Sequence, residues 1–126
     1  MTALFRKITA IITLFAIVNN VHAQDIAYIQ PTKSWYYVYD QNGRKLSSLS
    51  TNNGELKGYS ATFYVIATKN WIYTYDTKSR KIASISVSSA GEVVGVAGDT
   101  FSTRLGSWIY IWDKHCKKVA TKSITR

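Results

Sequence analysis

Cysteine, proline and acidic residues are all scarce in this sequence. Its 126 residues include one cysteine, Cys116, and one proline, Pro31. A single cysteine excludes an internal disulfide, and stability must therefore come from buried apolar surface. The chain has 7 acidic against 16 basic residues, a net charge of +9. This surplus favours anionic partners such as acidic glycans, lipid headgroups, nucleic acid or acidic proteins, with simple solubility as the alternative.

The sequence also lacks an apolar run long enough to cross a bilayer, which takes about 20 residues. A short apolar run from Ile8 to Val18 follows Arg6 and Lys7, and the small residue Ala23 comes five positions after it. A basic start, a short apolar stretch and a small final residue predict a secretory signal peptide over residues 1–23, cut after Ala23. We therefore expect a secreted or periplasmic protein with one domain, residues 24–126.

What the chain does contain is a threefold repeat of the pattern Trp-x-Tyr-x-aromatic-Asp. The copies begin at Trp35, Trp71 and Trp108, and each is followed by a turn and a lysine. Such regularity indicates a repeat protein whose units pack on one another, with boundaries at 24–60, 61–98 and 99–126. The aspartates that end the pattern, and the lysines five positions later, are Asp40, Asp76, Asp113, Lys45, Lys81 and Lys118.

Each repeat contains three short runs of β-type residues. The second run ends at the aspartate, and Asn42-Gly43 after Asp40 is typical of a hairpin turn. The third run alternates β-branched residues with Ser, Ala and Thr, as in a half-buried strand. Gly-containing segments at 53–58 and 90–95 predict a weaker fourth strand in the first two repeats, which brings the chain back to the first run.

These patterns predict an all-β fold of three tandem repeats of about 36 residues. Three architectures fit them: a pseudo-threefold β-prism or trefoil, a small sandwich or barrel, and propeller-like blades that a second subunit completes. The second repeat resembles in rhythm the β-prism lectins of the monocot mannose-binding type. The Gln and first Asp of their signature have no equivalents here, and the resemblance therefore implies architecture alone. It is carried by Thr62, Phe63, Val65, Asn70, Ile72, Tyr75 and Asp76.

Two sets of residues are candidates for binding. Alternation places an aromatic ladder on one face of each central strand, which is either core packing or a platform for stacking ligands. Basic residues gather at the turns after these strands, as an anion-binding rim or as solvated turns. The ladder comprises Trp35, Tyr37, Tyr39, Trp71, Tyr73, Tyr75, Trp108, Tyr110 and Trp112. The rim comprises Arg44, Lys45, Lys78, Arg80, Lys81, Lys114, Lys117 and Lys118.

Signs of catalysis are weak. The repeated aspartates would diverge around the domain, and we interpret them as turn caps. His115 and Cys116 are adjacent and would point apart, while a further His or Cys cluster for a metal is missing. Lysines beside Cys116 predict a lowered thiol pKa and a reactive thiol, or else a plain surface thiol.

We therefore expect a non-catalytic binding module that needs no cofactor. The first hypothesis is recognition of an anionic glycan or envelope polymer by repeated weak sites. The alternative is a protein–protein module, such as an inhibitor or immunity-type protein that docks on an acidic partner. Secretion argues against nucleic acid as the ligand, and pairing of an edge strand with another chain stays open.

Overall fold

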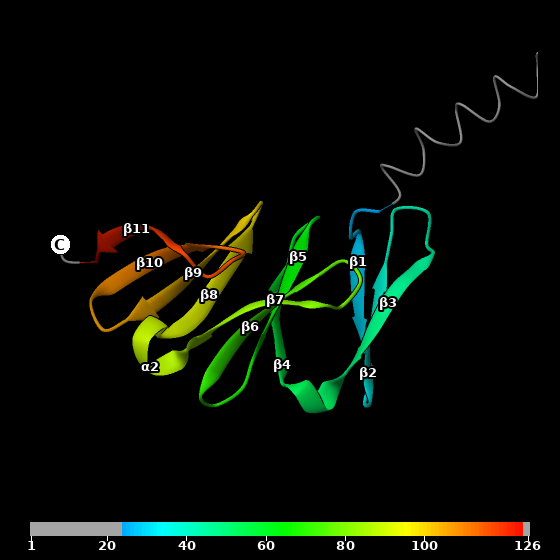
Figure 1. The fold of residues 1–126 in the computed structure, drawn as a ribbon, viewed down its shortest axis with the longest axis horizontal. Coiled ribbons are helices and arrows are strands. Elements are labelled where there is room, and N and C mark those ends of the chain that lie inside the picture. Colours follow the sequence, from blue (N-terminus) through cyan, green and yellow to red (C-terminus); the bar gives the residue numbers. More distant parts are fainter. Residues whose placement is uncertain (1–23, 125–126) are drawn as a thin grey trace, which may run out of the picture.

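The protein is described from residue 24 to residue 124 by a computed structural model (Figure 1). The predicted signal peptide, residues 1–23, lies outside the described residues, as do residues 125–126. Within the described range no helix is long and apolar enough to span a membrane.

The described chain forms three separate antiparallel sheets. The first contains β1 (Tyr28–Pro31), β2 (Trp35–Tyr39) and β3 (Lys45–Ser50). The second contains β4 (Glu55–Tyr59), β5 (Phe63–Ala67), β6 (Trp71–Asp76) and β7 (Lys81–Ser86). The third contains β8 (Glu92–Ala97), β9 (Thr100–Leu105), β10 (Trp108–Asp113) and β11 (Lys118–Ser123). Two single turns of helix, η1 (Thr51–Asn53) and α2 (Val87–Ala90), connect the sheets.

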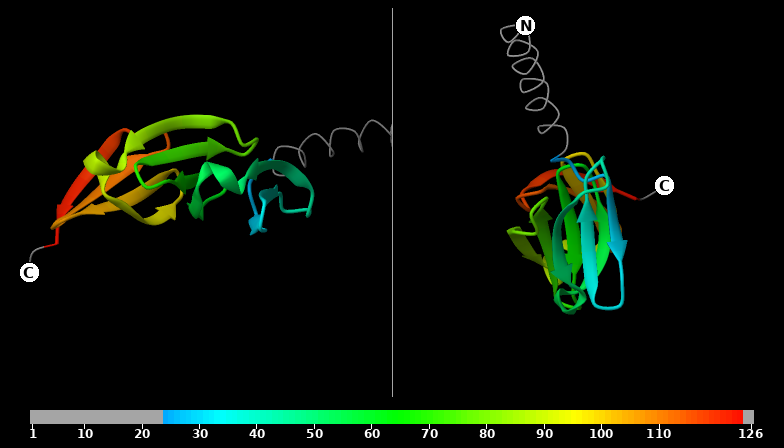
Figure 2. Two further views of the ribbon diagram at one scale, coloured as in Figure 1. Left: turned by 90° about the horizontal axis from the view of Figure 1, so that it is seen from below. Right: turned by 90° about the vertical axis from the view of Figure 1, so that its right-hand side faces the viewer.

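The predicted all-β class with three repeated strand units is confirmed. Every sheet is a simple up-and-down meander, and the sheets pack in sequence order along the long axis without closing into a barrel (Figures 1 and 2). The expected fourth strands are β4 and β8. Each of them pairs with the first strand of the following repeat, and each sheet is consequently offset from the sequence repeat by one strand.

The core lies between neighbouring sheets, in two clusters of buried side chains. Ile29 and Val38 of the first sheet meet Tyr64 and Ile66 of the second. On the opposite side, the second sheet packs against Phe101 and Trp112 of the third through Phe63, Val65 and Ile72. Burying aromatic and branched side chains on both sides of the middle sheet supplies the stability that a disulfide would otherwise give.

The two faces of each sheet differ in composition, and all three sheets are oriented the same way along the row. On β6, Tyr73 and Tyr75 pack toward the first sheet, whereas Ile72 packs toward the third. Thr74 shares the Ile72 face because side chains alternate along a strand. The second and third sheets therefore present their tyrosine and tryptophan face to the preceding sheet, and the first and second present their smaller apolar face to the following one.

The same irregularity recurs in every sheet, where the central strand pairs with the outer one. The register shifts between Val38 and Tyr39, between Thr74 and Tyr75, and between Ile111 and Trp112. A bulge at this position strengthens the local twist of the strand pair. Its extra residues are Leu46, Ile82 and Val119, of which the first two pack into the clusters.

The second and third sheets come closest where their edge strands β4 and β8 meet. Gly58 faces Val96, and a Cβ at Gly58 would lie 2.8 Å from the Val96 Cγ2 atom. Valine cannot turn this methyl group away freely because its χ1 angle is restricted. The absence of a side chain at Gly58 therefore permits the close contact.

We expect Gly58→Ala to lower the free energy of unfolding by about 1–3 kcal/mol, because the added methyl group overpacks the crossing. Gly95→Ala is the matched control, since Gly95 follows the equivalent bulge in β8 and its Cβ would meet only Ser102 Oγ at 3.5 Å. Urea unfolding of both variants measures the difference. Equal effects of the two substitutions would contradict the close approach of β4 and β8.

Candidate functional site

The repeated aspartates close the turns after the central strands. Asp40 Oδ1 accepts hydrogen bonds from the amides of Asn42 and Arg44, at 2.8 and 2.9 Å. Asp76 and Asp113 bind the corresponding amides of their own turns at 2.9–3.0 Å. A carboxylate that accepts two turn amides serves as a cap. The role of turn caps predicted for these residues is confirmed.

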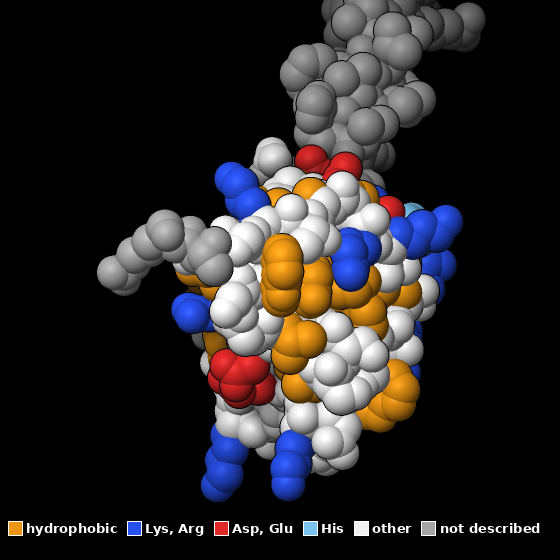
Figure 3. Space-filling view, turned by 90° about the vertical axis from the view of Figure 1, so that its left-hand side faces the viewer, with side chains coloured by type: hydrophobic (Ala, Val, Ile, Leu, Met, Phe, Trp, Pro, Cys, Tyr) orange, Lys and Arg blue, Asp and Glu red, His pale blue; other side chains and the backbone are white. Residues whose placement is uncertain are grey.

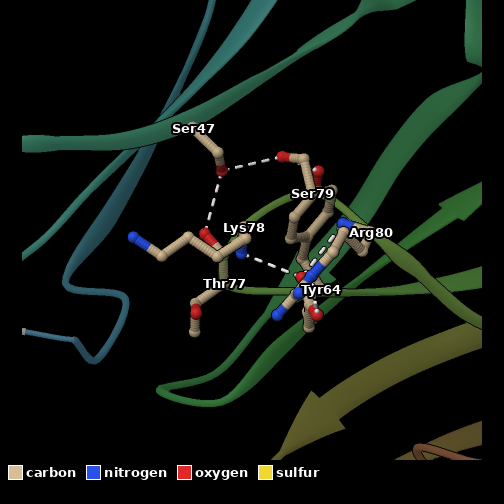
Figure 4. A network of polar contacts seen from close by, with 7 residues as sticks. Ser47, Tyr64, Thr77, Lys78, Ser79 and Arg80 are labelled. Atoms are coloured by element: carbon tan, nitrogen blue, oxygen red, sulfur yellow. Dashed lines mark hydrogen bonds and ion pairs between the residues drawn. The ribbon is translucent and has the colours of Figure 1, made fainter.

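Each of the last two turns also docks on the preceding sheet. In Figure 4, Ser47 Oγ donates to the Thr77 carbonyl at 2.8 Å and shares a 2.8 Å hydrogen bond with Ser79 Oγ. Tyr64 OH donates to Ser79 Oγ at 2.6 Å. In the next turn the Lys114 carbonyl accepts from Thr74 Oγ1 at 2.7 Å. The backbone of these turns is therefore held against the preceding sheet, and so the basic residues of the turns start from fixed positions.

Cys116 occupies the left-handed position of its turn, with φ 61°, as Gly43 and Ser79 do in theirs. Its side chain packs against the second core cluster, and burial raises the thiol pKa to about 11. The predicted lowering of the thiol pKa by neighbouring lysines is wrong, because burial disfavours the thiolate and the nearby Asp113 carboxylate raises the pKa further. His115 is exposed and does not share this environment.

The lysines five positions after the aspartates lie over tyrosine rings. Lys45 Nζ is 5.0 Å from the centroid of the Tyr37 ring, and Lys81 Nζ is 4.3 Å from that of Tyr73. In the third sheet Lys118 Nζ lies 4.1 Å from the Tyr110 centroid. These cation–π contacts explain the constant spacing between the aspartate and the lysine.

The rest of the predicted rim differs from one repeat to the next. Arg80 Nε forms an ion pair with Asp76 Oδ2 at 3.0 Å, and Arg44 Nε lies 3.9 Å from Asp40 Oδ2. Lys114 Nζ lies 3.7 Å from Asp99 Oδ1. The ammonium group of Lys78 extends away from the hydrogen-bond network (Figure 4), and Lys117 is exposed.

The aromatic ladder divides into a buried part and an exposed part. Tyr75 and Trp112 are 4% and 5% exposed, and a ligand cannot reach them in this structure. Tyr73, Tyr110, Tyr37 and Tyr39 are half-buried. The tryptophans that begin the strands are accessible to a ligand: Trp35, Trp71 and Trp108 are 43%, 45% and 47% exposed.

Two of these tryptophans line open pockets of the same construction. The pocket at Trp35 has a volume of about 340 Å³, and the one at Trp71 about 390 Å³. In both, the lysine two positions before the tryptophan and the turn after the outer strand complete the lining. The first is completed by Lys33, Ser34, Ser50, Thr51 and Asn52. The second is completed by Lys69, Asn70, Ser86, Val87 and Ser88.

Matching hydrogen bonds hold the two pockets in shape. Thr32 Oγ1 accepts from the Trp35 amide at 2.9 Å, and Thr68 Oγ1 accepts from the Trp71 amide at 3.1 Å. The opposite wall is a serine whose hydroxyl caps a single helical turn. Ser50 Oγ accepts from the Asn52 amide and Ser86 Oγ from the Ser88 amide, at 3.2 and 3.1 Å. The same pocket is consequently built by the same backbone and side-chain hydrogen bonds in the first and second repeats.

Sequence reasoning missed the lysines and serines of these pockets. The available signals were a lysine two positions before Trp35 and Trp71, and a serine at the end of each third run. In the third repeat Gly106 replaces the lysine, although the Ser107 carbonyl still accepts from the Ile124 amide at 2.8 Å. Trp108 is therefore an exposed tryptophan without an adjacent cation of this kind.

A further cleft of about 370 Å³ lies beside the Trp71 pocket, with Lys69 and Val87 as shared walls. It opens next to Ile72 and is also lined by Glu55 and Glu92. At the other interface, Tyr36 replaces Ile72 and fills the equivalent space. Its hydroxyl donates to the Gly54 carbonyl at 2.7 Å and accepts from the Leu56 amide at 3.1 Å.

The pockets have the chemistry of a binding site. Indole rings stack on flat apolar faces, hydroxyls and amides form directional hydrogen bonds, and an ammonium group attracts an anion. Between residues 24 and 124 there is no cluster of three His, Cys, Asp or Glu residues that could hold a metal ion. The fold and these pockets define an all-β repeat protein with recurrent tryptophan–lysine sites. Comparison with known families and with curated proteins finds no match.

We expect the Cys116 thiol to be unreactive in the native protein. Its pKa of about 11, against an ordinary 9.0, reduces the thiolate population near pH 8 about 100-fold. Ellman's reagent should therefore modify the native protein at least about tenfold more slowly than the urea-unfolded protein, since thiolates of lower pKa are also less nucleophilic. Equal rates would show that the thiol is not buried.

Stability should fall in alkaline solution. Burial raises the pKa of Tyr64 from 10.0 to about 12 and that of Cys116 from 9.0 to about 11. Both groups lose their protons at a lower pH in the unfolded protein than in the folded one. Their contribution to the free energy of unfolding is therefore intact below pH 9 and is lost as the pH rises toward 12. Urea unfolding at pH 8 and pH 10.5 measures this decline. A Tyr64→Phe, Cys116→Ala variant should show a smaller one.

Proposed function

We propose that the protein is a non-catalytic binding module, acting outside the cytoplasm, that recognises an anionic glycan or envelope polymer. The supporting observation is the recurrence of one pocket at Trp35 and Trp71, with the same lysine and the same serine-capped turn. A structural role alone would not require both the exposed indole and the adjacent cation to repeat.

The pocket chemistry favours sugars that carry acidic groups. The apolar face of a pyranose ring stacks on an exposed indole, and its hydroxyls match the serine, threonine and asparagine groups of the turn. Lys33 and Lys69 would pair with a carboxylate or sulfate. The excess of basic residues over the whole chain would assist the approach of a polyanion.

Repeated weak sites also suit a polymer better than a small ligand. Each pocket is open and shallow, and an isolated sugar would bind weakly there. A chain that occupies both pockets gains from the effective concentration of the second site, which raises the affinity without any new contact.

We expect Trp35→Ala and Trp71→Ala each to weaken polymer binding about tenfold, and the double variant to lose retention, because stacking is removed from one or both sites. Trp108→Ala is the matched control, since Trp108 is equally exposed but has Gly106 in place of the lysine. Retention on immobilised polygalacturonate, heparin and neutral dextran, with a salt titration, measures the effect.

Failure to bind any of these polymers at low salt would remove the glycan hypothesis. Loss of binding in Trp108→Ala equal to that in Trp71→Ala would show that the lysine pocket is not the site. Retention by an acidic protein that depends on Lys78 and Lys117, and not on the tryptophans, would instead favour the protein–protein module.

A further inference from the structure

The row of sheets formed by residues 24–124 has an uncovered face at each end. One resembles the aromatic side of an internal interface, and the other resembles its apolar side. Inside the row, the aromatic face of one sheet covers the smaller apolar face of the sheet before it. Among residues 24–124, no sheet precedes the first sheet on its aromatic face and none follows the third on its apolar face (Figures 1 and 2). We call these surfaces the head face and the tail face.

The head face carries the one uncovered copy of a repeated aromatic pair. The register aligns Tyr64 with Tyr75 in the second sheet, and their rings stack at 5.3 Å. Phe101 and Trp112 form the same pair in the third sheet, at 6.5 Å. All four side chains are 0–5% exposed. The equivalent pair on the head face is Tyr28 and Tyr39, and Tyr28 is 51% exposed.

The tail face carries apolar residues at positions that are interior elsewhere. Ile109 and Ile111 alternate with Tyr110 and Trp112, which pack toward the second sheet, and they therefore point away from it. The positions equivalent to Ile109 hold Tyr36 and Ile72, and those equivalent to Ile111 hold Val38 and Thr74, all at most 7% exposed. Val119 corresponds to the packed Leu46 and Ile82.

Without a following sheet, the tail face is open to solvent. Val119 is 56% exposed, and a hollow of about 290 Å³ lies beside Gly95, Ser102 and Ile111. Figure 3 shows this end of the molecule, with hydrophobic side chains at its centre and basic side chains mostly toward its margin. Such a patch on a charged protein marks an interaction surface.

We propose that a second copy of this chain occupies these surfaces, with the head face of one molecule packed on the tail face of the other. The internal interfaces supply the template, because the end surfaces bear equivalent residues in the same strand register. A contact between two different surfaces is heterologous, and it forms a ring if the rotation closes and an extended row if it does not.

The size of the residues in the turn after β2 suits the proposed contact between head face and tail face, which we call the new joint. Its left-handed position is Gly43, which has no side chain, whereas Ser79 and Cys116 project side chains at the internal joints. Cys116 lies against Thr74 across its joint, and by this correspondence Gly43 would face Ile111, which is larger than Thr74. A smaller residue on one side is thus matched by a larger one on the other.

The proposed joint is weaker than the internal ones. Ile111 and Ala120 occupy the positions of Thr74 and Ser47 in the third sheet, and neither has a hydroxyl to donate to a docked turn. We therefore expect weak association, with a dissociation constant on the order of micromolar.

Sedimentation analysis of single and mixed variants tests the proposal. Tyr28→Lys blocks the head face and leaves the tail face intact, while Val119→Lys does the reverse, with Ile111→Lys as a second tail variant. We expect the unaltered protein to associate below about 100 μM and each variant alone to be monomeric. An equimolar mixture of Tyr28→Lys and Val119→Lys should form a dimer and nothing larger, since one functional joint remains.

Ser84→Lys is the matched control, because it adds the same charge at an exposed position of β7 in the middle sheet and should leave association unchanged. Unaltered unfolding midpoints would show that the variants are folded. A monomer at all concentrations up to about 100 μM would overturn the proposal. Failure of the mixture to form a dimer would also overturn it, since that result indicates a symmetric contact or none.

Discussion

The docking of the second and third carboxylate-capped turns on the preceding sheet is the interaction on which the row of sheets depends. The aspartate fixes the turn by accepting two amides, and the fixed turn presents a carbonyl to a hydroxyl one sheet away, as at Thr77 and Ser47. The rigid turn holds its carbonyl in place for this bond. The partner hydroxyls belong to Ser47 and to the fully buried Thr74, and these bonds set the alignment of one sheet on the next while hydrophobic burial supplies the free energy.

The strands and turns could be predicted from the sequence, because both follow from local chemistry. Aspartate followed by a position with positive φ specifies a turn, and alternating β-branched residues specify a half-buried strand. The offset of the sheets from the sequence repeat could not be predicted. The segments that became β4 and β8 can pair on either side, and only long-range packing, such as Val96 against Gly58, determines which sheet they join.

The candidate site was predictable in part for the same reason. The tryptophans were identified by their periodicity, but alternation does not say which face of a strand is covered. Tyr75 is buried and Trp71 is exposed, although both lie on one face, because the neighbouring sheet covers only part of it. Cys116 shows the converse problem. Its sequence neighbours are basic, yet its turn conformation directs the thiol toward the core, where burial governs its pKa.

The offset by one strand has a consequence for how such a chain can change in length. The segment from β4 to the end of α2, residues 55–90, makes one complete sheet and the connection to the next. A tandem duplication of this segment would insert a whole sheet with the same order of aromatic and apolar faces, and it would add one more tryptophan–lysine pocket. The number of sheets could therefore vary by gene duplication with adjustment of a single interface, where Ala83 would stand in the place of Ser47, and the number of tryptophan–lysine pockets would change with it.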